Sequence, residues 1–131
     1  MKDSQDLNNQ LAQHTGSQSA YRHTLARSVC YTEGVQYFAQ NAGGGAYWLL
    51  DILATEPKIL GLARKEGIAF AALAVKDGKA ILSVAADSGI PPVFTREITS
   101  TDCPDGDWMF YIQPTEIGDQ PVIMILLPSE Y

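Results

Sequence analysis

Residues 67–86 read GIAFAALAVKDGKAILSVAA, and this stretch decides the fold. Two apolar runs, residues 70–75 and 80–86, flank a polar turn at residues 76–79 whose centre is Asp77-Gly78. An Asp-Gly pair between two apolar runs is typical of a two-residue type I′ turn. The stretch therefore predicts a β-hairpin in the middle of the chain.

The strand pattern continues after this hairpin. Residues 93–99 alternate, with Phe94, Arg96 and Ile98 on one face, and residues 122–127 form an apolar run near the end. Between them, residues 108–113 have strand composition, and we expect Pro114 to stop that strand. The C-terminal half thus predicts five strands joined by short turns.

Before Gly67 the apolar spacing is helical instead. Thr32 is a suitable N-cap for a helix that carries Glu33 in its first turn and ends at the glycines of residues 43–45. A second, mostly apolar helix is predicted at residues 46–55, because Pro57 forces Glu56 out of the helical region. A third, short helix is expected at residues 59–63.

These patterns predict one α+β domain at residues 21–131, with N-terminal helices packed on one face of a mainly antiparallel sheet of four or five strands. Residues 1–20 are rich in Gln, Asn, Ser and His, so we expect a mobile polar arm, in which Leu7 and Leu11 allow at most a turn or two of helix. A chain of 131 residues is long enough to bury one hydrophobic core.

The charge of the chain disfavours several function classes. Fifteen acids against nine bases give a net charge of −6. Nucleic acids and anionic membranes attract Lys and Arg clusters, so we expect neither as a direct partner. An acidic surface can instead meet a basic protein partner, or simply keep the chain in solution.

The cysteines and the apolar runs indicate a location. Cys30 and Cys103 have no metal or redox spacing, and MKDSQDLNNQL at the start has no apolar core of a secretory signal. The apolar run at residues 122–127 is too short to cross a bilayer. We therefore expect a cytoplasmic protein with reduced thiols.

Several motifs together resemble a known family. They are Tyr-Thr-Glu-Gly-Val at residues 31–35, Ala-Tyr-Trp-Leu-Leu-Asp at 46–51, Asp-Ser-Gly at 87–89 with Pro-Pro-Val at 91–93, Thr-Asp at 101–102 and Leu-Pro-Ser-Glu-Tyr at 127–131. The set resembles a family of uncharacterised bacterial proteins, a domain of unknown function common on plasmids and integrated elements. The resemblance implies a compact bacterial cytoplasmic domain and carries no activity with it.

One candidate site lies on the second predicted helix. Tyr47 and Asp51 are four residues apart and share a helix face, so a desolvated Asp51 could exchange a proton with the phenol. Together with Trp48 and Trp108, they could line a ligand pocket between this helix and the sheet. The alternative is structural, with Asp51 accepting hydrogen bonds that hold the helix against the sheet.

Three further patterns each have a simpler explanation. The glycines at 43–45 precede a helix and could bind an anion, but a helix break accounts for them. Asp102, Asp105 and Asp107 could bind calcium, yet Asp-Gly-Asp is also turn chemistry, and we expect no metal and no cofactor. Cys30 or Cys103 would need a base, and His14 and His23 are the two histidines in the chain.

The sequence therefore favours a non-enzymatic binding or accessory module that acts through a protein partner and is carried on a mobile element. The alternative is a small enzyme or ligand-binding domain that uses the pocket of Tyr47, Trp48, Asp51 and Trp108. A homodimer is a further expectation, because residues 122–127 are strongly apolar and we expect them at a sheet edge, where unpaired backbone groups can bind another strand.

Overall fold

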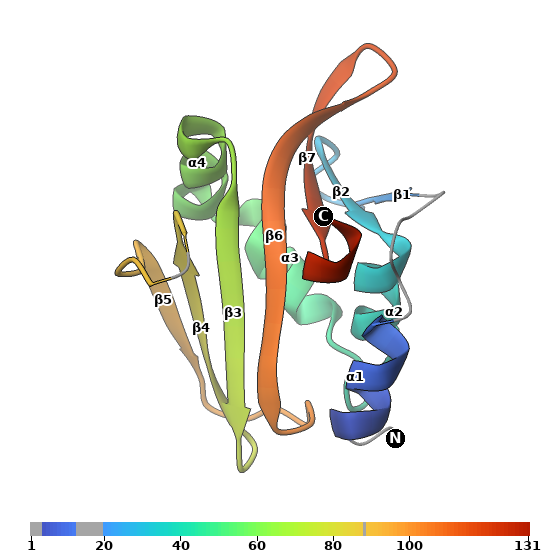
Figure 1. Ribbon diagram of the computed structural model, residues 1–131, viewed down its shortest axis with the longest axis vertical. Coiled ribbons are helices and arrows are strands. Elements are labelled where there is room, and N and C mark those ends of the chain that lie inside the picture. Colours follow the sequence, from blue (N-terminus) through green and yellow to red (C-terminus); the bar gives the residue numbers. More distant parts are fainter. Residues whose placement is uncertain (1–3, 13–19, 88) are drawn as a thin grey trace.

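A computed structural model describes residues 4–12, 20–87 and 89–131. Its helices are α1 (Ser4–Ala12), α2 (Glu33–Asn41), α3 (Tyr47–Thr55), α4 (Pro57–Glu66) and the 3-10 turn η1 (Pro128–Glu130). Its strands are β1 (Ala20–Arg22), β2 (Val29–Thr32), β3 (Ala69–Lys76), β4 (Lys79–Ala85), β5 (Phe94–Ile98), β6 (Gly106–Ile117) and β7 (Gln120–Leu126). Figure 1 shows the arrangement.

The described strands form one sheet in the order β1-β2-β7-β6-β3-β4-β5. The predicted α+β class is confirmed, but the sheet has seven strands, which is more than the four or five expected. It is also mixed, because β2 runs parallel to β7 while the other neighbouring pairs are antiparallel. A parallel neighbour far along the chain leaves no local signal in the sequence.

The hairpin and the helix ends form as predicted. Asp77 and Gly78 have φ angles of 53° and 77°, the left-handed pair that a type I′ turn requires. The Thr32 hydroxyl accepts a hydrogen bond from the amide of Val35, 3.3 Å away, and so caps α2. Glu56 is extended and separates α3 from α4, which is longer than the short helix expected.

Helices α2, α3 and α4 pack on one face of the sheet, and α3 lies behind β6 and β3 in Figure 1. The core forms between these layers. Phe38 of α2 lies edge-on to Phe110 of β6, with ring centroids 5.1 Å apart, and 5.6 Å from Trp108. Leu49, Leu50 and Leu53 bury the inner side of α3. The predicted packing of this helix on one face of the sheet is therefore confirmed.

Two predicted positions in the sheet are wrong. Strand β6 does not stop at Pro114 but continues to Ile117. Beyond Ile112 its register with β3 ends and only β7 remains beside it, so the missing N–H of proline can face an unpaired side. All of the run at residues 122–127 except Leu127 belongs to β7, which is an interior strand between β2 and β6 and not a sheet edge.

The predicted arm at residues 1–20 is described only in part. Residues 4–12 form α1, whose Leu7 and Leu11 are buried in the core cluster. Ser129 of η1 donates a hydrogen bond to the carbonyl of Leu11. The expectation of mobility for residues 1–3 and 13–19 falls outside the described residues.

Candidate functional site

Glu130 joins two of the motifs named above. Its Oε1 accepts a hydrogen bond from the Thr32 hydroxyl at 2.6 Å and from the amide of Leu127 at 3.0 Å, while Oε2 accepts from Gly34 at 3.4 Å. A carboxylate at the first turn of α2 also suits the helix dipole. A β-carbon on Gly34 would lie 2.6 Å from Leu127 and 2.8 Å from Glu130. Tyr-Thr-Glu-Gly-Val and Leu-Pro-Ser-Glu-Tyr thus form one structural clamp.

Asp102 makes a second clamp of this kind. Its Oδ2 accepts a hydrogen bond from the amide of Gly44 at 2.8 Å. Gly43 has a φ of 61°, and a β-carbon there would collide with the backbone carbonyl of Asp102. The position that the glycines offer to an anion is therefore taken by the carboxylate of the chain itself.

Asp51 holds a histidine. Its Oδ1 lies 2.8 Å from Nε2 of the buried His23, while the Asp51 side chain is 60% exposed. Nδ1 of His23 accepts hydrogen bonds from the amides of Leu25 and Ala26 at 3.2 and 3.0 Å. Nδ1 must therefore carry no proton, and Nε2–H donates to Asp51. Both ring nitrogens are engaged, so the imidazole ties the segment after β1 to α3.

Tyr47 and Tyr21 both lie near Tyr31. Burial raises the pKa of the Tyr31 phenol above its usual 10.0, and the nearby phenols of Tyr47 and Tyr21 add to this shift. The rings of Tyr21 and Tyr31 stack with centroids 5.8 Å apart. Asp51 contacts His23, which follows β1, and Tyr47 lies near Tyr31 of β2, so both side chains lie on the side of α3 toward these strands.

The two tryptophans are in different surroundings. Trp108 is 2% exposed, and its indole N–H donates to the carbonyl of Pro104 at 2.9 Å. Trp48 lines a hollow of about 440 Å³ with Ile98, Thr101 and other residues between α3 and the β5 end of the sheet. Of the four residues predicted to line a ligand pocket, Trp48 lines this hollow, whereas Tyr47, Asp51 and Trp108 do not. The ligand pocket itself stays a prediction.

The remaining candidate residues do not converge. Asp105 accepts a hydrogen bond from the amide of Asp77 at 3.1 Å, and Asp107 points to the other side of the sheet from the helices. Within the described residues, no group of three His, Cys, Asp or Glu side chains is placed to hold a metal ion. Cys30 and Cys103 are buried and unpaired. Burial raises the pKa of the Cys103 thiol above its usual 9.0.

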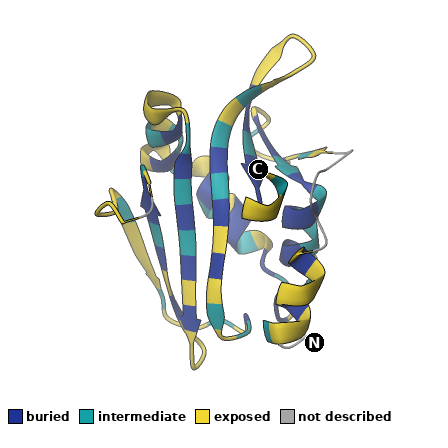
Figure 2. Ribbon diagram, viewed as in Figure 1, coloured by how far each residue is buried: buried dark blue, intermediate teal, exposed yellow. Residues whose placement is uncertain are grey.

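The candidate site is the sheet face opposite the helices, which we call the open face. Three rows of side chains cross it in register: Asp107-Ala74-Ile81-Glu97, Met109-Ala72-Ser83-Thr95 and Tyr111-Phe70-Ala85. Figure 2 shows the resulting alternation of buried and accessible residues along β3 and β6. Ile81 is 53% exposed and Met109 is 42% exposed. At one end of these rows, the ring of Tyr131, the residue after η1, packs on Tyr111.

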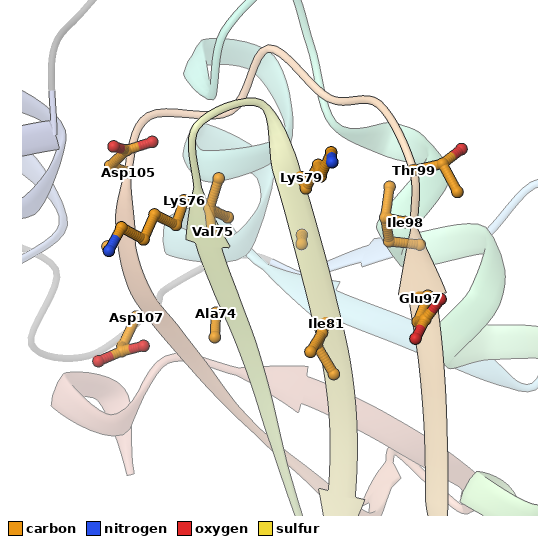
Figure 3. Close-up of a pocket in the computed structure, with 12 residues that line it drawn as sticks. Ala74, Val75, Lys76, Lys79, Ile81, Glu97, Ile98, Thr99, Asp105 and Asp107 are labelled. Carbon is orange, nitrogen blue, oxygen red and sulfur yellow. The ribbon is translucent and has the colours of Figure 1, made fainter.

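A hollow of about 880 Å³ lies at one end of the open face, and we call it the hairpin hollow. Figure 3 shows its lining: Ala74 at the floor, Ile81 and Glu97 on one side, and Lys76 extending toward β6, where Asp105 and Asp107 lie. The floor is low at Ala74, because this residue of β3 presents only a methyl group. Charges of both signs surround an apolar centre, an arrangement typical of a binding surface.

A second hollow of about 490 Å³ lies at the other end, and we call it the aromatic hollow. Its ring-bearing residues are Phe70, Tyr111 and Tyr131, with Glu66 and Asp87 as its charged members. The rings of Phe70 and Tyr111 have centroids 5.1 Å apart, and those of Tyr111 and Tyr131 are 4.9 Å apart. The open face was not predicted from the sequence. One signal was present, because Phe70, Ala72 and Ala74 share one face of β3 and no polar residue lies between them.

A family model matches residues 5–131, nearly the whole chain and all five motifs. The chain belongs to that family, described as a family of unknown function (DUF6876). The predicted resemblance to a domain of unknown function is confirmed. No curated protein and no solved structure matches the chain. Membership of DUF6876 therefore does not indicate an activity. The motif residues Glu130 and Asp102 make hydrogen bonds that join distant segments of the fold.

The α-helices of the described residues have nine or ten residues each. None of them is long and apolar enough to cross a bilayer.

Proposed function

We propose that the chain is a non-enzymatic binding or accessory module that acts through a protein partner, and that the open face is its binding surface. The observation that carries the proposal is the exposure of Ile81 and Met109 on the interior strands β4 and β6 of a sheet whose opposite face is packed with helices. Grouped exposed apolar residues with a polar rim mark interaction surfaces. Met and aromatic residues are also enriched in protein interfaces.

The shape of the open face supports a macromolecular partner. Ala72, Ala74 and Ser83 form a low central strip, while Ile81 and Met109 rise on either side of it. Such a strip can accept side chains of a partner, and the charged rim can set its orientation. The engagement of both nitrogens of His23 supports the non-enzymatic part of the proposal, because the one described histidine has no nitrogen left to act as a base.

A cytoplasmic location is part of the proposal. Cys30 and Cys103 are unpaired thiols in the interior. Thiols stay reduced in that compartment.

The test is crosslinking in cells followed by quantitative mass spectrometry of the captured proteins. We expect one protein to be captured by the wild type and reduced about tenfold or more by Ile81→Lys and Met109→Lys, since charges at an interface centre are costly. The matched control is Leu25→Lys, which changes a residue 77% exposed in the β1–β2 connection, and it should retain the protein. If no captured protein depends on Ile81 or Met109, the proposal is wrong.

A second candidate function, a ligand-binding domain or small enzyme, is favoured by the hollow beside Trp48. Ser100, Thr101 and Asp102 line this hollow together with Trp48. Native mass spectrometry of the purified chain tests it: a bound small molecule that is lost in Trp48→Leu would support this function. A wild-type mass equal to that of the chain alone would contradict it.

A further inference from the structure

We propose that the aromatic hollow receives an arginine side chain of the protein partner. This inference rests on the proposed function, because the hollow forms one end of the open face.

The geometry of the rings is the first support. The planes of Phe70 and Tyr111 are inclined by 58°, and those of Tyr111 and Tyr131 by 71°. Inclined rings present π faces in more than one direction around a shared space. A cation within about 6 Å of such a face is attracted by the ring quadrupole. Ile68 and Ile90 complete an apolar lining against which the methylene stem of a long side chain can pack.

The charge of the hollow is the second support. Both of its charged lining residues, Glu66 and Asp87, are carboxylates, and they come from the end of α4 and from the segment after β4. The two bases that precede Glu66 line other hollows, Arg64 near Pro114 and Lys65 near Pro57. The aromatic hollow is thus complementary to a cation, whereas the hairpin hollow carries charges of both signs.

Arginine fits this combination better than lysine does. A guanidinium is planar and weakly hydrated, so it stacks on a ring and still donates hydrogen bonds from its edge to a carboxylate. An ammonium is more strongly hydrated and would have to give up more of that hydration to pack against the rings. We therefore expect arginine to occupy the hollow, and the titration compares it with lysine.

The experiment is an NMR titration of the full chain with N-acetyl-L-arginine methylamide, with the citrulline analogue as the neutral control of equal shape. We expect saturable shifts of the Phe70, Tyr111 and Tyr131 ring signals with arginine and binding at least tenfold weaker with citrulline. Tyr131→Leu and Glu66→Gln should each weaken arginine binding about threefold to thirtyfold. Glu116→Gln, on β6 and outside the hollow, is the matched control and should leave it unchanged.

The outcomes separate this inference from the proposed function. Equal binding of arginine and citrulline, or tighter binding of the lysine analogue, would overturn the inference. If the crosslinked protein still depends on Met109 in that case, the proposed function stands and only the arginine assignment is wrong. Sedimentation velocity gives the last arm: a dimer that Glu66→Gln dissociates would assign the hollow to a second copy of the chain and overturn the partner assignment.

Discussion

The two faces of the sheet use the same strands in different ways. Toward the helices, β3 presents Ala69, Ala71, Leu73 and Val75, all buried. Toward the open face it presents Phe70, Ala72, Ala74 and Lys76, which are half-buried or exposed. Neighbouring strands repeat the contrast, since β4 and β6 place Leu82 and Phe110 under the helices and Ser83 and Met109 on the open face.

The difference teaches that an uninterrupted apolar surface decides which face gains a layer, because the covered residues of β3 are all apolar, whereas Lys76 and Ser83 interrupt the open face. A buried Leu or Phe contributes about 1.5 to 3 kcal/mol, whereas the methyl of alanine contributes roughly 0.8 kcal/mol. The covered face therefore has enough area to hold three helices against their loss of conformational freedom. On the open face, Lys76 and Ser83 lie among the apolar residues, so a helix packed there would bury polar groups.

The largest effect should separate the two faces at adjacent residues of one strand. Phe110→Ala removes a fully buried ring that packs on Phe38, and we expect unfolding free energy to fall by about 3 to 5 kcal/mol. Met109→Ala, one residue away on the open face, should cost less than about 1 kcal/mol. Urea denaturation followed by circular dichroism measures both. Equal losses would mean that the open face is packed as tightly as the covered one.

A smaller effect should distinguish covered from uncovered glycines in helices. Gly34→Ala forces a methyl against Leu127 and Glu130, so we expect a loss of about 1 to 3 kcal/mol. Gly61 in α4 has nothing within 4 Å of its added β-carbon, and Gly61→Ala should stabilise the chain by about 0.5 to 1 kcal/mol. Thermal unfolding of the two variants is the measurement. A destabilised Gly61→Ala would contradict the assignment of its side of α4 to solvent.

The covered face could be predicted from sequence because its signals are local. The hairpin at Asp77-Gly78, the Thr32 cap and the change of period at Gly67 each depend on residues within a few positions. Strands β1 and β2 could not be found in this way. They have three and four residues, and β2 is ordered by a partner almost a hundred positions away.

The candidate site was less predictable for a related reason. A structural role was one of two alternatives for Asp51, but its partner His23 could not be predicted, because it is 28 positions away in a segment with no helical or strand pattern. The aromatic hollow combines residues of α4, β3, β6 and the chain end. The one sequence signal for an open apolar surface is that neither face of β3 is polar before Lys76. An apolar run of this kind also fits a strand that is buried on both sides.

The smallest effect concerns protonation on the covered side. Burial raises the pKa of the Cys103 thiol above its ordinary 9.0; a hydrogen bond from Thr101 opposes this and the Asp102 carboxylate adds to it. The unfolded chain therefore loses this proton at lower pH than the folded chain, so folding stability is full below about pH 9 and declines as pH rises through the folded pKa. Urea unfolding of wild type and Cys103→Ala, both under reducing conditions from pH 7 to 11, measures the difference. We expect the two stability curves to run parallel up to about pH 9 and the wild type to fall faster above it. Curves that stay parallel to pH 11 would mean that water reaches this thiol in the folded state, as it reaches the open face.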